Sequence, residues 1–127
     1  MASTISTRLM ISGAAVTSDP IAVDYVSNPT VTAPAIESAS VDITPAGVEI
    51  LTTGATPTRT FLYVKNTGSV SQSYITVGFD CAETATNFIR LNLGEFCYLP
   101  LVPSQTVTLD CPATVTGHAE YGYFTAV

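Results

Sequence analysis

Hydrophobic residues alternate with polar ones in many short runs along this chain, and a period of two is that of a half-buried β-strand. In the first 57 residues the runs are Ile5–Ile11, Ile21–Tyr25, Val41–Ile43 and Val48–Ile50. Five of the eight prolines lie in this half, and proline cannot donate to a central ladder. We therefore predict a sheet of short edge strands and extended connections here. The alternative is that part of this half is an extended arm lying on a neighbouring subunit.

The second half, residues 58–127, shows the strand pattern more clearly. No stretch of ten residues has the period of an amphipathic helix. Six strands are predicted, and they are Thr60–Asn66, Ser73–Asp80, Phe88–Asn92, Phe96–Leu101, Thr106–Cys111 and His118–Val127.

Three consecutive strands of this half predict an antiparallel meander. A turn at Leu93-Gly94-Glu95, with Gly94 at the positive-φ position, pairs Ile89 with Leu99. A second turn centred on Ser104 pairs strand 96–101 with strand 106–111. A slip of one residue in either turn would scatter the apolar side chains over both faces. The pairing brings one apolar set to a single face: Ile89, Leu91, Cys97, Leu99, Leu101, Val107, Leu109 and Cys111.

The predicted fold class is accordingly all-β, an antiparallel β-sandwich or a jelly-roll-like barrel with a C-terminal meander. A length of 127 residues corresponds to one domain, so residues 1–127 are expected to form a single β domain. Within it, residues 1–57 are the Pro/Thr-rich half that includes the arm in the alternative prediction.

The outward face of the meander carries a candidate interface. Arg90, Phe96 and Tyr98 share this face, and the register pairs Arg90 with Tyr98. A cation over the ring would add about 0.5–1 kcal/mol. Exposed aromatic side chains beside one arginine are more typical of an interface than of a solvated face. The alternative is that a second sheet or the N-terminal half covers these residues.

Composition and charge exclude several classes of partner. Only 11% of the residues are charged, whereas Ser and Thr make up 31 of 127, which fits a pleated surface. The net charge is −6 and no basic stripe exists, so neither nucleic acid nor an anionic membrane is an expected partner. No run approaches the roughly 18 apolar residues of a membrane span, and Leu9–Val16 lacks the cleavage motif of a signal peptide.

Catalytic and metal-binding residues are not evident in the sequence. His118 is the single histidine, and no serine lies in a G-x-S-x-G elbow, so a hydrolytic triad is not expected. Asp80 and Glu83 flank Cys81 and are interpreted as solvated loop acids, because a calcium loop would need more oxygen ligands. No glycine-rich phosphate loop is present. We predict no enzyme activity, no cofactor and no metal.

The three cysteines, Cys81, Cys97 and Cys111, are an odd number without C-x-x-C spacing. We predict that they are small buried apolar residues rather than a disulfide framework, as in a chain made in a reducing cytosol.

Several segments of the second half resemble small β-rich virion proteins of tailed bacteriophages. These segments are FLYVKNTGS (Phe61–Ser69), TVGFD, FIRLNLGEFCYLPL (Phe88–Leu101) and AEYGYF (Ala119–Phe124). In such proteins a strand ending in KNTG precedes a hairpin of the form L-x-x-G-E-x-x-x-L-P-L, and the chain ends on an aromatic strand. The resemblance covers Phe61 to Phe124, and no functional residue follows from it.

The resemblance implies a capsid decoration (cement) protein that stabilises the phage head by binding between capsomers. It would be a homo-oligomer in the virion, assembled in the host cytoplasm, with the major capsid protein or other virion proteins as partners. One alternative is a tail, neck or head-fibre subunit. Another is a carbohydrate-binding adhesion module that stacks sugars on Phe96, Tyr98, Tyr121 or Tyr123, although the chain has no tryptophan.

Overall fold

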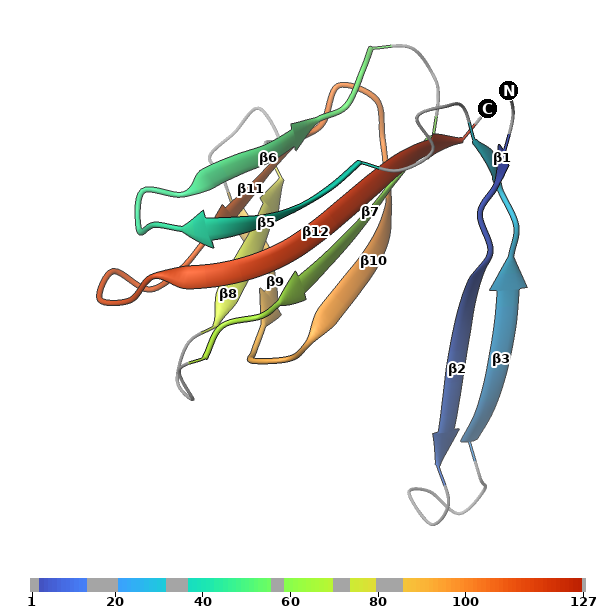
Figure 1. Ribbon diagram of the computed structural model, residues 1–127, viewed down its shortest axis with the longest axis horizontal. Coiled ribbons are helices and arrows are strands. Elements are labelled where there is room, and N and C mark those ends of the chain that lie inside the picture. Colours follow the sequence, from blue (N-terminus) through green and yellow to red (C-terminus); the bar gives the residue numbers. More distant parts are fainter. Residues whose placement is uncertain are drawn as a thin grey trace.

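The computed structural model describes residues 3–13, 21–31, 37–55, 59–69, 74–79 and 86–126 (Figure 1). Within these ranges the chain forms strands and no helix. In chain order the strands are β1 (Ser3–Thr4), β2 (Thr7–Gly13), β3 (Ile21–Ser27), β4 (Thr30–Val31), β5 (Glu37–Ile43), β6 (Val48–Thr52), β7 (Arg59–Asn66), β8 (Ile75–Phe79), β9 (Thr86–Leu91), β10 (Phe96–Leu101), β11 (Thr106–Asp110) and β12 (Gly117–Ala126).

Two antiparallel sheets form the body of the molecule. In the first sheet the order is β5–β12–β7–β10, and β4 pairs with the end of β12 and carries β1 beyond it. In the second sheet the order is β6–β11–β8–β9. The edge strands β9 and β10 do not pair with each other, so the two sheets form an open sandwich and not a closed barrel. The predicted all-β, sandwich fold class is confirmed.

The hydrophobic core lies between the two sheets. In the two four-stranded arrays its most deeply buried hydrophobic side chains come from β5, β7, β8, β11 and β12, and β6, β9 and β10 close the core with Leu51, Leu91 and Leu101. The largest side chains with no more than 2% exposure are Val31, Ile43, Leu62, Val64, Ile75, Val77, Val107 and Leu109, together with Asn66.

Strand β7 shows how the sequence pattern sets the two faces of the first sheet. Thr60, Leu62, Val64 and Asn66 are buried, and the residues between them are partly exposed on the outer face. β7 pairs with β10 on one side and with β12 on the other. Directly paired residues share a face, so the alternation of buried and exposed residues in β7 also determines which residues of β10 and β12 face the core.

The predicted meander is wrong in its pairing. Strand β9 pairs with β8, β10 pairs with β7, and β11 pairs with β6 and β8, so none of these three strands pairs with the next one along the chain. Both turns instead carry the chain from one sheet to the other. Ile89 and Leu99 still approach each other, but across the core rather than along a shared ladder.

The two turns themselves lie where they were expected. Gly94 has φ of 78° and Ser104 has φ of 57°, both in the left-handed region. The amide of Gly94 donates to the carbonyl of Asn66, and the amide of Ser104 donates to the carbonyl of Gly54. The first turn is thus tied to the end of β7, and the second is tied to the segment that follows β6. We call these two connections between the sheets arches.

Glycine occurs inside two strands. The ladder between β8 and β9 shifts register between Val77 and Gly78, where β9 has one residue more than β8. Gly122 lies in β12 between Ser38 and Tyr63, where the ladder is regular.

Strands β2 and β3 form a separate two-stranded hairpin, which stands away from the sandwich (Figure 1). We call these two strands the hairpin arm. Its base is held by the amide of Ile5, which donates to the carbonyl of Pro29, and by the short β1–β4 pairing. The strands predicted in the first half are therefore present.

Candidate functional site: an exposed hairpin and an aromatic face

The hairpin arm has one apolar face. Residues directly opposite in an antiparallel pair share a face, and here Leu9 opposes Tyr25 while Ile11 opposes Val23. All four side chains are between 43% and 65% exposed. The alternation in the sequence predicts a buried face, yet within the described chain this face has no cover.

The opposite face of the arm, which we call the polar face, carries an ion pair together with two exposed apolar side chains, Met10 and Val26. Both guanidinium nitrogens of Arg8 that face Asp24 donate to its carboxylate, at 2.7 Å and 2.6 Å. This hydrogen bond lowers the pKa of Asp24 and raises that of Arg8. Ser12 lies on the same face and is exposed. All the charges of the described arm thus lie on the polar face, and the face of Leu9 and Ile11 is the more apolar of the two.

A cluster of aromatic side chains covers part of the outer face of the first sheet. We call it the aromatic face, and its members from β7, β10 and β12 are Phe61, Tyr63, Phe96, Tyr98 and Phe124. Opposed strand positions place them side by side, since Tyr98 pairs with Tyr63 and Phe124 pairs with Phe61.

Ring stacking organises this face. The Phe61 ring centroid lies 5.1 Å from that of Phe124 and 5.7 Å from that of Tyr98, with nearly parallel planes. Tyr63 and Phe96 are 6.1 Å apart. Phe124 is buried, whereas Phe96 remains 62% exposed and Tyr98 36% exposed. The aromatic rings are therefore closely packed in the middle of this face and exposed to solvent along β10.

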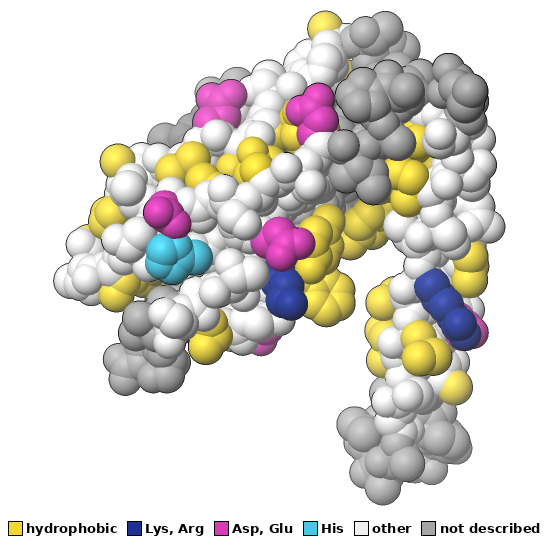
Figure 2. Space-filling model, viewed as in Figure 1, with side chains coloured by type: hydrophobic (Ala, Val, Ile, Leu, Met, Phe, Trp, Pro, Cys, Tyr) yellow, Lys and Arg dark blue, Asp and Glu magenta, His cyan; other side chains and the backbone are white. Residues whose placement is uncertain are grey.

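A hollow of about 300 Å³ lies between the base of the arm and the aromatic face. Ile5 and Thr7 line it from the arm side, and Tyr98 and Phe124 line it from the sheet. Gly122 leaves it open at the centre, because it presents no side chain between Ser38 and Tyr63. Figure 2 shows hydrophobic side chains on the arm and on the side of the body that faces it.

The structure separates the three residues of the predicted interface. Phe96 and Tyr98 belong to the aromatic face, but Arg90 lies on β9 of the other sheet, where it pairs with Thr76. Its guanidinium carbon is 3.8 Å from the centroid of the Tyr74 ring, so the predicted contact with Tyr98 is wrong. The error follows from the meander, which placed β9 and β10 in one sheet.

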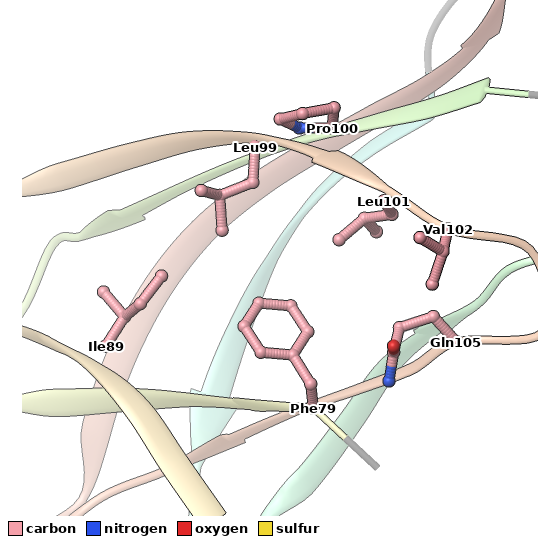
Figure 3. A pocket seen from close by; sticks show the side chains of 7 residues that line it. All are labelled: Phe79, Ile89, Leu99, Pro100, Leu101, Val102 and Gln105. Carbon is pink, nitrogen blue, oxygen red and sulfur yellow. The ribbon is translucent and has the colours of Figure 1, made fainter. Parts of the chain in front are cut away.

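A second apolar hollow, of about 380 Å³, opens at the sandwich edge between β9 and β10. Figure 3 shows Phe79, Ile89 and Leu99 pointing toward one another there from three different strands. Gln105 contributes a polar side chain to the lining. The hollow is the gap left by two edge strands that do not pair.

Chemistry-bearing side chains do not converge in the part of the chain that the structure describes. Nδ1 of His118 lies 2.6 Å from an oxygen of Asp42, and both side chains are exposed on the sheet surface. Within these ranges no three His, Cys, Asp or Glu side chains group in a way that could hold a metal ion, and no helix could cross a membrane. Asp80, Cys81 and Glu83 lie outside the described residues.

The two described cysteines are free thiols. Cys111 is buried, and its Sγ donates to the carbonyls of Ile43 and Val115, each at 3.2 Å. Burial raises the pKa of the Cys97 thiol, so the reactive thiolate is disfavoured. Cys111 is therefore buried as predicted, whereas Cys97 is only partly buried.

The four aromatic residues of the alternative sugar platform do not share a surface. Phe96 and Tyr98 face outward, whereas Tyr121 and Tyr123 pack against the core. The Tyr123 hydroxyl donates to the Glu37 carboxylate, and this hydrogen bond raises the pKa of Tyr123 to about 12.

Comparison with known proteins gives limited information. No protein-family model matches the sequence, and the search of curated proteins found no match. Among solved structures, a chain of Bacillus endospore appendages, described as a novel family of disulfide-linked pili, is similar. The similarity has a TM-score of 0.46 and 16% identity, and it covers 72% of this chain and 88% of that chain. A similarity of this degree does not establish a family or a function.

Proposed function

We propose that this chain is a non-enzymatic structural subunit that acts by burying its hairpin arm and aromatic face in a larger assembly. The observation that carries the proposal is the uncovered apolar face of the arm, formed by Leu9, Ile11, Val23 and Tyr25. A two-stranded hairpin is only marginally stable in water, so an apolar face on such a hairpin favours a protein surface as its cover.

The assembly that we propose is a phage particle, with the chain as a capsid decoration protein. Support comes from the resemblance of Phe61–Phe124 to small virion proteins, and from a surface poor in charge that suits a subunit held by its neighbours. A decoration protein binds assembled capsomers better than free ones, and this difference in binding stabilises the shell. A tail, neck or head-fibre subunit is the alternative location.

Purified particles of a phage that encodes the chain provide the test. Mass spectrometry should detect the chain in the particles, and immunogold labelling should locate it on the head. Particles stripped of the chain should regain their disruption temperature when the purified protein is added. The variant Ile11→Asp should restore it poorly, whereas Ser12→Asp, on the polar face of the same arm, should act like the wild type.

The outcomes separate the competing functions. Label on the tail or neck would support the alternative location. Absence of the chain from particles, together with binding of glycans by the isolated protein, would refute the virion proposal in favour of an adhesion module. Equal activity of Ile11→Asp and Ser12→Asp in the particle assay would exclude the arm as the contact.

A further inference from the structure

We infer that two copies of this chain exchange their hairpin arms, so that the apolar face of each arm packs on the aromatic face of the other copy. The inference rests on the proposed function, because it names the first partner of the same surfaces.

Beyond its base, the arm does not pack on its own sandwich. β2 and β3 pair with each other, and beyond its base the arm diverges from the body (Figure 1). Only Ile5 and Thr7, at the base, line the hollow against the aromatic face. Leu9, Met10, Ile11, Val23, Tyr25 and Val26 remain 43–67% exposed.

The aromatic face is the matching surface on a second copy. Outside the arm, the large hydrophobic side chains that the described chain leaves exposed all lie on β10 or in the turns at its two ends: Leu93, Phe96, Tyr98 and Val102. Two of them belong to the aromatic face, since Tyr98 stacks on Phe61 and Phe96 lies against Tyr63. A partner that covers this face covers the exposed rings of β10.

The two surfaces agree in length and are mainly apolar. The arm strands have seven residues and β7 has eight. The Arg8–Asp24 pair lies on the far side of the arm, whereas Arg59, Lys65 and Glu120 flank the aromatic rings. The guanidinium carbon of Arg59 is 6.0 Å from the centroid of the Phe61 ring. A second copy supplies both apolar surfaces at once.

Area favours exchange in both directions. A seven-residue hairpin is about 23 Å long and 10 Å wide, so one arm covers on the order of 230 Å². A single docked arm would bury roughly 460 Å² in total, and reciprocal exchange doubles this to roughly 900 Å². That size is typical of weak interfaces, so we expect a weak, reversible dimer of the isolated chain.

Sedimentation equilibrium of the full chain and matched variants tests the exchange. Ile11→Asp on the arm and Phe96→Asp on the aromatic face should each weaken the dimer by about tenfold or more, since each buries a charge against apolar atoms. Ser12→Asp, on the polar face of the arm, and Ser40→Asp, on β5 of the same sheet, make the same charge change and should leave the Kd unchanged. All four side chains are surface residues, and unchanged circular dichroism will show that the variants fold.

Mixing the two defective variants distinguishes reciprocal exchange from other contacts. Each homodimer carries a defect in both arm–face contacts. The mixed dimer has one intact contact, between the wild-type arm of Phe96→Asp and the wild-type face of Ile11→Asp. We expect the mixture to associate more tightly than either variant alone.

A monomeric wild-type chain at concentrations up to about 1 mM would overturn the exchange. An undiminished dimer of Ile11→Asp, or a mixture no tighter than its components, would do the same. The proposed function would survive these results if Ile11→Asp still failed to restore stripped particles, because the arm would then bind a different virion protein.

Discussion

Gly117 shows how tightly the core is filled at the start of β12. A methyl group built on its α-carbon would lie 3.1 Å from Cγ2 of Ile75, 3.2 Å from Cβ of Cys111 and 3.4 Å from Cβ of Ile43. These neighbours belong to strands of both sheets or to the segment between β11 and β12, and none is the end of a long flexible side chain. Residue 117 must therefore be glycine because the surrounding side chains leave no room for a methyl group, and not because of its backbone conformation.

Gly117→Ala should destabilise the fold by about 1–3 kcal/mol, the usual cost of overpacking a core. Urea denaturation followed by circular dichroism measures the change. Gly54→Ala is the control, because nothing lies within 4 Å of its added methyl group. We expect the control to stay within about 0.5 kcal/mol of the wild type. Equal midpoints for the two variants would contradict the crowding at residue 117.

Tyr123 is the residue whose titration the structure perturbs most clearly. Its hydroxyl donates to Glu37, so the neutral form is favoured and the pKa rises from 10.0 to about 12. A pKa raised in the folded state means that this contribution to stability is complete below pH 10 and is lost as the pH rises through 12.

Spectrophotometric titration at the tyrosinate band should show one tyrosine ionising near pH 12. Glu37→Gln removes the carboxylate charge and should move this titration toward the ordinary value of about 10. Glu49→Gln is the control, since Glu49 accepts a hydrogen bond from Thr52 and does not contact Tyr123. A high-pH titration that persists in Glu37→Gln would assign the shift to another cause.

The arches are the elements that decide the architecture. The 92–95 arch is tied to β7 through Asn66, which is 1% exposed. The side chain of Asn66 donates to the carbonyl of Leu91 and accepts from the amide of Gly68, while its main chain bonds to Glu95 and Gly94. One buried amide thus holds the last residue of β9 and the turn against the opposite sheet.

Asn66→Ala should cost about 1–3 kcal/mol, because the carbonyl of Leu91 then loses a buried donor. The free energy of unfolding in urea is the measurement. Asn28→Ala provides a matched control, since Asn28 is exposed at the base of the arm. A loss in Asn66→Ala no larger than that of the control would show that the arch is held by its backbone bonds alone.

The strands, the turns at Gly94 and Ser104, and the inward side chains were all predictable from the sequence, but the pairing was not. In a hairpin the two strands lie side by side in one sheet, and in an arch they face each other across the sandwich. In both cases alternate side chains of each strand point into the core, so the two arrangements bury the same residues. The agreement among Ile89, Leu99, Leu101 and Val107 therefore tested burial and could not test which strand bonds to which. The partner of β10 is β7, which ends at Asn66, whereas β10 begins only at Phe96.

The candidate site was predictable to a similar extent. Phe96 and Tyr98 stand out as aromatic residues on the outward side of an apolar strand, and in the structure both are exposed. Arg90 was joined to them only through the wrong pairing. An arm within residues 1–57 was only the alternative prediction, because the alternation at Leu9 and Ile11 is the same for a buried strand as for an exposed strand without a partner.

At the scale of the whole molecule, net charge opposes the association that the apolar surfaces favour. Two copies each carry −6, so they repel at low ionic strength. Raising the salt concentration from about 0.1 M to about 1 M shortens the Debye length from about 10 Å to about 3 Å. The arm-exchanged dimer should consequently tighten with added salt, as sedimentation equilibrium can measure. A dimer that loosens in salt would indicate a contact dominated by ion pairs instead.

The central place of β12 in the first sheet also fixes an order of events during synthesis. This strand separates β5 from β7, so the sheet cannot close until residues 117–126 have left the ribosome. The β2–β3 hairpin needs only its own two strands and emerges about ninety residues earlier. On each nascent chain the arm would therefore be displayed well before that chain's own aromatic face exists.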